Sequence, residues 1–406
     1  MKYMQRIYTE RAHLMCPAMF FGIVIAIDSI FDKDRVLSAA DELSKAHPFL
    51  QSVLGHDDVG YYYNITNISK IQIIFRDDAV SGIDDPILLR EYNSVTKNEW
   101  DLRKDGMLKI LTFHYGDKTI FLFVFHHLLA DGRGALGLAE EFAKCYKTGI
   151  VPDHVEEKLI SSKKDMPESS TLPFVSKLLV KRANKQWKRE NHTLTYDEYL
   201  ELANKYYGSD KIARNIKLET ADAYTKMVEA CHEHRVSIND YLMAQMYMKD
   251  KTDKIIIAYD LRKRLSCYNL GALGNYSTAF SVEYKNKTSD VWKAAQDVHD
   301  IIRKKTDDPK SLYLVLQCYA DLEGELLDAS FAAARCGYES KAAGFIGTMF
   351  FGFAESKGYS ITNLGKFDSR NIEEAVFIPP ASPAIKKTLG VLTVNGKMYI
   401  SSAVRE

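Results

Sequence analysis

Two adjacent histidines, with an aspartate and a glycine shortly after them, are the side chains that point most directly to chemistry. They are His126 and His127, followed by Asp131 and Gly132. A histidine with an unperturbed pKa of about 6.5 is mostly neutral at pH 7, so its ring can accept a proton from an alcohol, an amine or a thiol. Two other interpretations compete with a general base. The pair could be structural and hydrogen-bonded in the core, or it could contribute to a metal site.

A buried strand is expected to position both rings. Residues 119–127 form an apolar run that ends on the two histidines and follows a Gly-Asp turn, which favours a strand over a helix. Because successive side chains of a strand point to opposite faces, His127 is expected beside Phe125, and His126 beside Val124. Both faces are apolar, so at least one imidazole is protected from water. The strand-then-turn layout, with no third ligand nearby, disfavours a metal site.

The composition excludes several classes of function. Lys plus Arg and Asp plus Glu both number 54, so no basic excess favours a nucleic acid partner. The longest apolar run, residues 17–27, is too short to span a bilayer, and the N-terminus lacks the layout of a signal peptide. Six cysteines without CxxC pairs fit reduced thiols, so we expect a cytoplasmic protein. The sequence contains no P-loop, GxGxxG or GxSxG motif, and we expect neither a bound cofactor nor a metal.

The pattern around the histidines alternates strands and helices in two halves joined by an irregular crossover over 150–174. In the first half we expect strands over 18–27, 60–76 and 108–115, and helices over 34–47, 86–97 and after Gly132. In the second half we expect strands over 211–218, 254–262, 271–280 and 359–365, helices over 221–233, 240–249 and from Ser289, and a hairpin over 389–404. Asn239 is the expected N-cap of the second of these helices, and Asn395-Gly396 the expected type I′ turn.

The segment His126-His127-Leu-Leu-Ala-Asp131-Gly132 resembles the HHxxxDG signature of the chloramphenicol-acetyltransferase-like superfamily. That superfamily holds the condensation domains of nonribosomal peptide synthesis and the alcohol acetyltransferases. Weaker similarities accompany the signature along nearly the whole chain. The segment 259–262 is similar to a family "DLR" strand end, residues 271–280 to an "LGN" strand, and residues 359–365 to the "SNLG" strand end of alcohol acetyltransferases.

The resemblance implies the fold. We expect an α/β protein of two chloramphenicol-acetyltransferase-like sandwich halves, arranged as a pseudo-dimer around a central channel. The N-terminal half, residues 1–160, would carry the histidine signature, and residues 161–406 would form the C-terminal half. The active site would lie in the channel between them.

The resemblance also implies roles for the signature. His127 would be the general base, and the acceptor would attack a thioester directly without an acyl-enzyme. Asp131 would be structural and paired with an arginine of the second half, for which Arg262 is the first candidate and Arg264 the second. An ordinary surface position for Arg262 remains open.

Three further residues complete the predicted site. Gly132 would let the chain turn close to the thioester arm. Asn363 would donate a hydrogen bond to the oxyanion through its amide, although a turn asparagine is nearly as good an interpretation. His126 would lie in the core or form part of the channel wall.

The predicted function is therefore transfer of an acyl group from acyl-CoA to an alcohol or amine, with the thioester as co-substrate. The expected partners are a small-molecule donor and acceptor, and we expect a monomer. One alternative is a donor bound through pantetheine to an acyl carrier protein. Another is a non-catalytic binding or scaffold protein, against which the complete histidine-aspartate signature argues.

Overall fold

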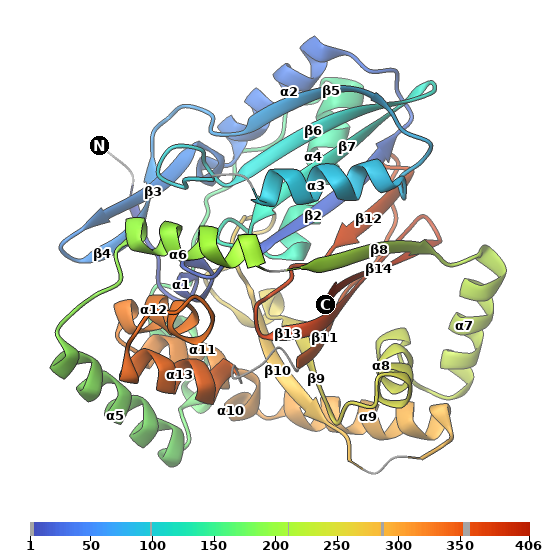
Figure 1. Cartoon of the computed structure of the whole chain (residues 1–406). Helices are drawn as coiled ribbons and strands as arrows, with labels where there is room; N and C mark the ends of the chain where they lie inside the picture. Colours follow the sequence, from blue (N-terminus) through green and yellow to red (C-terminus); the bar gives the residue numbers. More distant parts are fainter. Residues whose placement is uncertain (1–3, 98–99, 210, 286–287, 352–357) are drawn as a thin grey trace.

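The computed structural model describes residues 4–97, 100–209, 211–285, 288–351 and 358–406. It has the predicted α/β class. Two large sheets, one of five and one of six strands, lie one above the other in Figure 1, and a small three-stranded sheet flanks them. The small sheet has the order β1 (Met4–Arg6), β4 (Gly60–Ile65), β3 (Ser52–Asp57).

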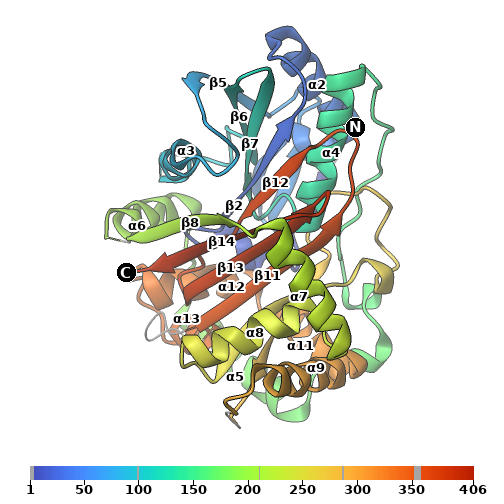
Figure 2. The same cartoon turned by 90° about the vertical axis from the view of Figure 1, so that its right-hand side faces the viewer.

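The five-stranded sheet carries the histidine signature at the end of a central strand. Its order is β12 (Glu374–Ile378), β2 (Phe20–Ile27), β7 (Lys118–His126), β6 (Leu108–Tyr115), β5 (Gln72–Ala79). Helices α2 (Lys33–Ala46) and α4 (Gly132–Thr148) cover one face, and α3 (Pro86–Lys97) covers the other (Figure 2). Each strand and helix predicted around the signature is therefore present, while the strands β1 and β3 were not predicted.

Strand β7 is buried because its residues fit a central position. Eight of its nine residues are buried, and it pairs antiparallel with β2 on one side and β6 on the other. Phe121 and Phe123 meet the ring of Phe142 on α4 at 5.0 and 5.3 Å. Each fully buried aromatic side chain of this kind stabilises the fold by about 1.5–3 kcal/mol. The strand ends at His126, one residue before the predicted end, and His127 begins the turn.

The turn from β7 into α4 is fixed by an aspartate cap and a close packing contact. The carboxylate of Asp131 caps α4 by accepting from the backbone N–H groups of Arg133 and Gly134 at 3.1 and 3.0 Å. Gly132 does not have a positive φ. A Cβ there would lie 2.7 Å from the Cδ2 atom of Leu364, so the glycine is required by space rather than by φ.

The six-stranded sheet belongs to the second half. Its order is β10 (Ser277–Glu283), β9 (Lys254–Asp260), β11 (Gly358–Phe367), β13 (Ile385–Val394), β14 (Lys397–Arg405), β8 (Ile212–Leu218). Helices α7 (Ala221–Glu233), α8 (Ile238–Lys249) and α9 (Val291–Asp307) lie beside it (Figure 2). The predicted hairpin is confirmed, since Asn395 and Gly396 both have positive φ, at 50° and 79°.

A second group of helices packs beside the sheets, mostly from segments for which no helix was predicted. These are α1 (Arg11–Leu14), α5 (Phe174–Glu190), α6 (Tyr196–Ser209), α10 (Pro309–Leu312), α11 (Leu314–Asp321), α12 (Gly324–Arg335) and α13 (Lys341–Phe351). The predicted crossover over 150–174 is irregular apart from the short 3-10 turns Lys163–Asp165, Glu168–Ser170 and the first residue of α5.

Two local expectations were wrong or incomplete. Ser237, and not Asn239, caps α8, because its hydroxyl accepts from Asp240 N–H at 3.1 Å while the Asp240 carboxylate reaches back to Ser237 N–H at 2.8 Å. Strand β12 pairs with β2, so residues 374–378 join the sheet of the first half although they lie in the predicted second half. Among the described residues, no helix is long and apolar enough to cross a bilayer.

A buried histidine holds the first half together and gives it a pH dependence. His47, at the end of α2, meets Glu141 on α4 at 2.8 Å and the buried Glu157 at 3.2 Å. Burial alone would lower the pKa of His47, but hydrogen bonds to the two carboxylates raise it to about 9. A folded-state pKa above the unfolded value stabilises the fold fully below about pH 6.5, and this stabilisation is lost as the pH rises through 9.

We therefore expect the free energy of unfolding to decline between about pH 6.5 and 9. The variant His47→Gln should be less stable at pH 6 and should lack this decline, because glutamine carries no proton to lose. Chemical denaturation of both proteins across this pH range would measure the effect. Parallel pH profiles for the two proteins would show that His47 is not the group responsible.

Candidate active site

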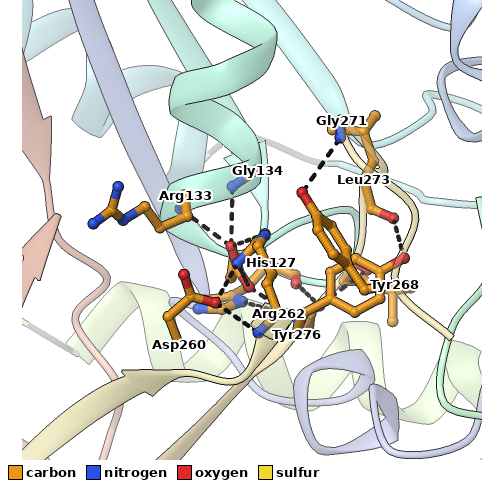
Figure 3. A network of polar contacts seen from close by, with 12 residues as sticks. His127, Arg133, Gly134, Asp260, Arg262, Tyr268, Gly271, Leu273 and Tyr276 are labelled. Carbon is orange, nitrogen blue, oxygen red and sulfur yellow. Dashed lines mark hydrogen bonds and ion pairs between the residues drawn. The ribbon is translucent and has the colours of Figure 1, made fainter. Parts of the chain in front are cut away.

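Asp131 and Arg262 join the two halves beside the histidine signature, as predicted. Arg262 Nη2 donates to Asp131 Oδ1 at 2.7 Å, and Nη1 donates to Oδ2 at 3.1 Å, in a two-pronged ion pair (Figure 3). Asp131 is 4% exposed, so the pair is shielded from screening by water. Arg264, the second candidate, instead donates to Thr306 O and Tyr259 Oη.

The surroundings of Arg262 show why a cation is stable there. Its guanidinium carbon lies 5.3 Å from the ring centres of both Tyr268 and Tyr276, and Nη1 also donates to Asp260 at 3.1 Å. Aromatic faces attract cations, and a desolvated arginine gains most from a fixed carboxylate. The exposed surface position that remained open for Arg262 is therefore wrong.

Asp131 also holds the segment that carries Asn275. Its Oδ2 accepts from Tyr276 N–H at 3.0 Å, and its own N–H donates to Gly274 O at 3.1 Å. Both bonds cross from the first half to the second. The residues on either side of Asn275 are therefore both hydrogen-bonded to Asp131. This places the Asn275 amide against His127.

Asn275 fixes the tautomer of His127. The amide Nδ2 of Asn275 donates to His127 O at 2.8 Å, so the amide oxygen is the atom that faces the imidazole. That oxygen lies 2.9 Å from His127 Nδ1. An amide oxygen only accepts, so Nδ1 carries the proton of the neutral ring and Nε2 carries the lone pair. Within the described chain Nε2 makes no hydrogen bond, which leaves it available as a base.

The environment of His127 keeps the ring neutral. Desolvation by the surrounding side chains lowers the pKa of His127, and its own backbone, the charge of Asp131 and the Asn275 hydrogen bond only partly oppose this effect. The residue nevertheless keeps part of its surface exposed, unlike the buried His126. A lowered pKa means that a base at this position loses function only at a pH below 6.5.

A third histidine lies against His127. The ring of His13, on α1, stacks on the ring of His127 with centroids 4.3 Å apart and planes 13° from parallel. The ring of Phe21 meets His127 edge-on at 5.1 Å. His13 Nδ1 is buried and has no hydrogen-bond partner in the described chain. Desolvation and the nearby histidines lower the pKa of His13, so it packs as a neutral ring that limits the rotation of His127.

The other predicted residues lie as follows. His126 is buried on the opposite face of the strand end and lines a cavity, which agrees with a core or channel-wall position. Asn363 closes a turn on β11, where its Oδ1 accepts from Gly365 N–H at 2.8 Å. Its neighbour Leu364 packs against Gly132, which brings this strand end near the start of α4. No described contact joins Asn363 to His127, and its role as an oxyanion donor stays a prediction.

Asn275 and His13 were missed as site residues. Asn275 lies inside the "LGN" segment, so the similarity marked its segment but gave it no role. His13 offered no signal, because it belongs to a helix of four residues and meets His127 only through the tertiary fold.

The Asn275 contact leads to a prediction about pH. The variant Asn275→Asp keeps an acceptor for His127 Nδ1–H, loses the amide donor to His127 O, and adds a negative charge beside the ring. A nearby negative charge favours the imidazolium, so the pKa of His127 should rise by about one unit. The acidic limb of the activity profile should move up by the same amount. Rate measurements from pH 4 to 9 would show this shift, and an unmoved limb would exclude control of the base by residue 275.

Comparison with solved structures supports the fold. The condensation domain of the monacolin K polyketide synthase has a TM-score of 0.61 at 11% identity, covering 100% of this chain and 92% of that one. Polyketide synthase associated protein 5 from Mycobacterium tuberculosis has a TM-score of 0.58 at 15% identity, covering 98% and 91%. The cyclization-docking bidomain of the EpoB synthetase from Sorangium cellulosum has a TM-score of 0.62 at 10% identity, covering 100% and 81%.

No protein with a curated description matches the chain. A family model for the condensation domain matches residues 3–249, which is more than half of the 406 residues. With the predicted superfamily fold present, this match establishes that the chain belongs to the condensation domain family.

Proposed function

We propose that this protein transfers an acyl group from a thioester to an alcohol or an amine, with His127 as the general base. Membership of the condensation domain family indicates acyltransferase-type condensation activity, without specifying the donor or the acceptor. The observation that carries the finer assignment is the contact between Asn275 and His127 Nδ1, which leaves the Nε2 lone pair free. A partly exposed, neutral imidazole of fixed tautomer is what deprotonation of an incoming nucleophile requires.

The reaction proceeds without a covalent intermediate on the protein. Nε2 of His127 takes the proton from the acceptor hydroxyl or amine as its oxygen or nitrogen attacks the thioester carbon. The carbonyl oxygen becomes an oxyanion, for which the Asn363 amide is the proposed donor. The C–S bond then breaks, and the thiolate receives the proton from the imidazolium. The products are an ester or amide and a free thiol, and His127 returns to its neutral form.

The donor is the point at which two candidates differ. The sequence favoured acyl-CoA, because of the similarity of residues 359–365 to alcohol acetyltransferases. The solved structures with the same fold include domains of synthetases, which favours a donor carried as a pantetheine thioester on a carrier protein. We place the carrier-linked thioester first, and acyl-CoA second.

One experiment separates these candidates. The same acyl group is offered on CoA, on pantetheine and on a carrier protein, with a mixture of alcohols and amines as acceptors, and thiol release is followed. A carrier-dependent enzyme should use the carrier-bound donor at the lowest KM. Equal use of all three donors would mean that only the pantetheine arm is recognised. If none of them releases thiol faster than with His127→Ala, the chain is the non-catalytic binding protein.

A further inference from the structure

A cavity on the other side of the strand end from Asp131 has no part in the proposed reaction. It has a volume of about 320 Å³ and lies where β2, the end of β7 and the segment after α3 meet α6. In both views α6 lies below α3, next to the five-stranded sheet (Figures 1 and 2). The volume lies at the lower end of the range for small-molecule sites, and its inner walls are made of buried side chains. His126 lines this cavity, and His127 does not.

Five aromatic rings line the cavity, among polar and charged side chains. Phe20 and Trp100 stack at 4.8 Å on one side, and Tyr196 meets Tyr199 at 5.7 Å on the other. Tyr207 adds a fifth ring. The ammonium of Lys109 lies 4.1 Å from the ring centre of Trp100, so a ligand ring would meet Trp100 at its edge. Edge and stacking contacts between aromatic rings contribute beyond the buried area. The walls therefore favour a planar aromatic ligand over an acyl chain.

His126 presents a hydrogen-bond donor to this cavity. Its Nδ1 accepts from Leu128 N–H at 3.2 Å, so in the neutral ring the proton is on Nε2. Burial lowers the pKa of His126 to about 3, which keeps the ring neutral. Within the described chain Nε2–H has no acceptor, and the hydroxyl of Tyr199 makes no hydrogen bond. The two buried side chains together would satisfy a phenolic hydroxyl, which both accepts and donates.

The mouth of the cavity carries a carboxylate without a counterion. Asp101 and Asp197 share Arg103 at 2.9 and 2.7 Å, and Lys104 lies 3.7 Å from Asp101. Glu201, on α6 at the same mouth, has no ion-pair partner among the described residues. A ligand that extends from the rings to the mouth would place its outer end beside this carboxylate, and a cation there is favoured.

We propose that this cavity binds a phenolic arylethylamine. The ring lies among the five aromatic side chains, its hydroxyl group meets His126 Nε2–H and the Tyr199 hydroxyl, and its ammonium group lies beside Glu201. The site is independent of the proposed acyl transfer, because it lies on the opposite face of the strand end from Phe125 and the Asp131 network.

Calorimetric titration with tyramine tests the proposal. Tyramine should bind with a dissociation constant of about 10⁻⁴ M, and its uncharged analogue 4-hydroxyphenylethanol about fivefold more weakly, since an exposed ion pair contributes no more than that. Phenethylamine, which lacks the hydroxyl, should also bind more weakly. Titrations without any thioester, repeated with His127→Ala, should give the same constants, so failure of the acyl-transfer assignment would not affect them.

Two variants and their controls locate the binding. Ala203→Phe fills the cavity from α6 and should abolish binding, whereas Lys205→Phe on the exposed side of α6 should not. Glu201→Gln should remove the preference for tyramine over the uncharged analogue, whereas Glu229→Gln on α7 should keep it. Glu201 is exposed, so this variant should fold even if Ala203→Phe does not. Tyramine that does not bind at about 10⁻³ M, or a preference that survives Glu201→Gln, would overturn the proposal.

Discussion

Replacing His127 with alanine should lower the rate of acyl transfer by about 10³-fold, which is the contribution typical of a positioned general base. The variant removes the Nε2 lone pair but leaves Asp131, Arg262 and Asn275 in place. The free energy of unfolding should fall by about 1–2 kcal/mol, because the variant loses the stacking contact with His13 and leaves the Asn275 amide oxygen without its donor. The comparison to make is the single-turnover rate at saturating donor and acceptor, together with a denaturation curve.

The neighbouring histidine supplies the matched control. His126→Asn removes an imidazole one residue away but keeps an oxygen that can accept from Leu128 N–H. It should retain most of the acyl-transfer rate, because its ring faces the other side of the strand end. Activity of more than a few per cent in His127→Ala, or an equal loss in His126→Asn, would remove His127 from the role of base.

Replacing Asp131 with asparagine should lower both stability and rate. The change leaves the buried guanidinium of Arg262 without its carboxylate, and breaking a buried ion pair in this way costs about 3 kcal/mol. It also weakens the acceptor for Tyr276 N–H, which helps to hold the segment of Asn275. The rate should therefore fall because Asn275 no longer holds the proton of His127 on Nδ1. Asp131 itself takes no proton in the reaction.

A control for this variant lies on the same arginine. Asp260 also accepts from Arg262, but it is exposed, so Asp260→Asn should cost less than about 1 kcal/mol. The double variant Asp131→Asn with Arg262→Met should recover part of the lost stability, because it removes the unpaired charge. A variant Asp131→Asn of normal stability with a lost rate would instead point to a direct chemical role for Asp131.

The sequence predicted those parts of the fold that local patterns determine. Strand β7 was predicted from an apolar run after a Gly-Asp turn, and helix α4 from the helical spacing of apolar residues after Gly132. The pairing of Asp131 with Arg262 also followed, but from the family resemblance, since 131 residues separate the two. The turn at Asn395-Gly396 was predictable because only a few residue types adopt its backbone readily.

What the sequence did not predict depends on contacts between distant segments. The ring of His13 stacks on His127, and Asn275 reaches the same ring from the other half. Neither contact leaves a local pattern. Strand β12 joins the five-stranded sheet from near the C-terminus, and no strand was predicted there. Gly132 was predicted as a site residue. The reason for a glycine there is its close packing against Leu364, which only the folded structure shows.

The central claim is that the acceptor attacks the thioester directly, with His127 as the base. The most direct test is to look for an acyl-enzyme. The protein is mixed with the thioester donor it uses best, with and without acceptor, and thiol release is followed while intact mass is recorded. Thiol should be released only when acceptor is present, at a rate that rises with acceptor concentration, and the protein should gain no mass. A burst of thiol equal to the amount of protein without acceptor, with an added acyl mass, would contradict the account.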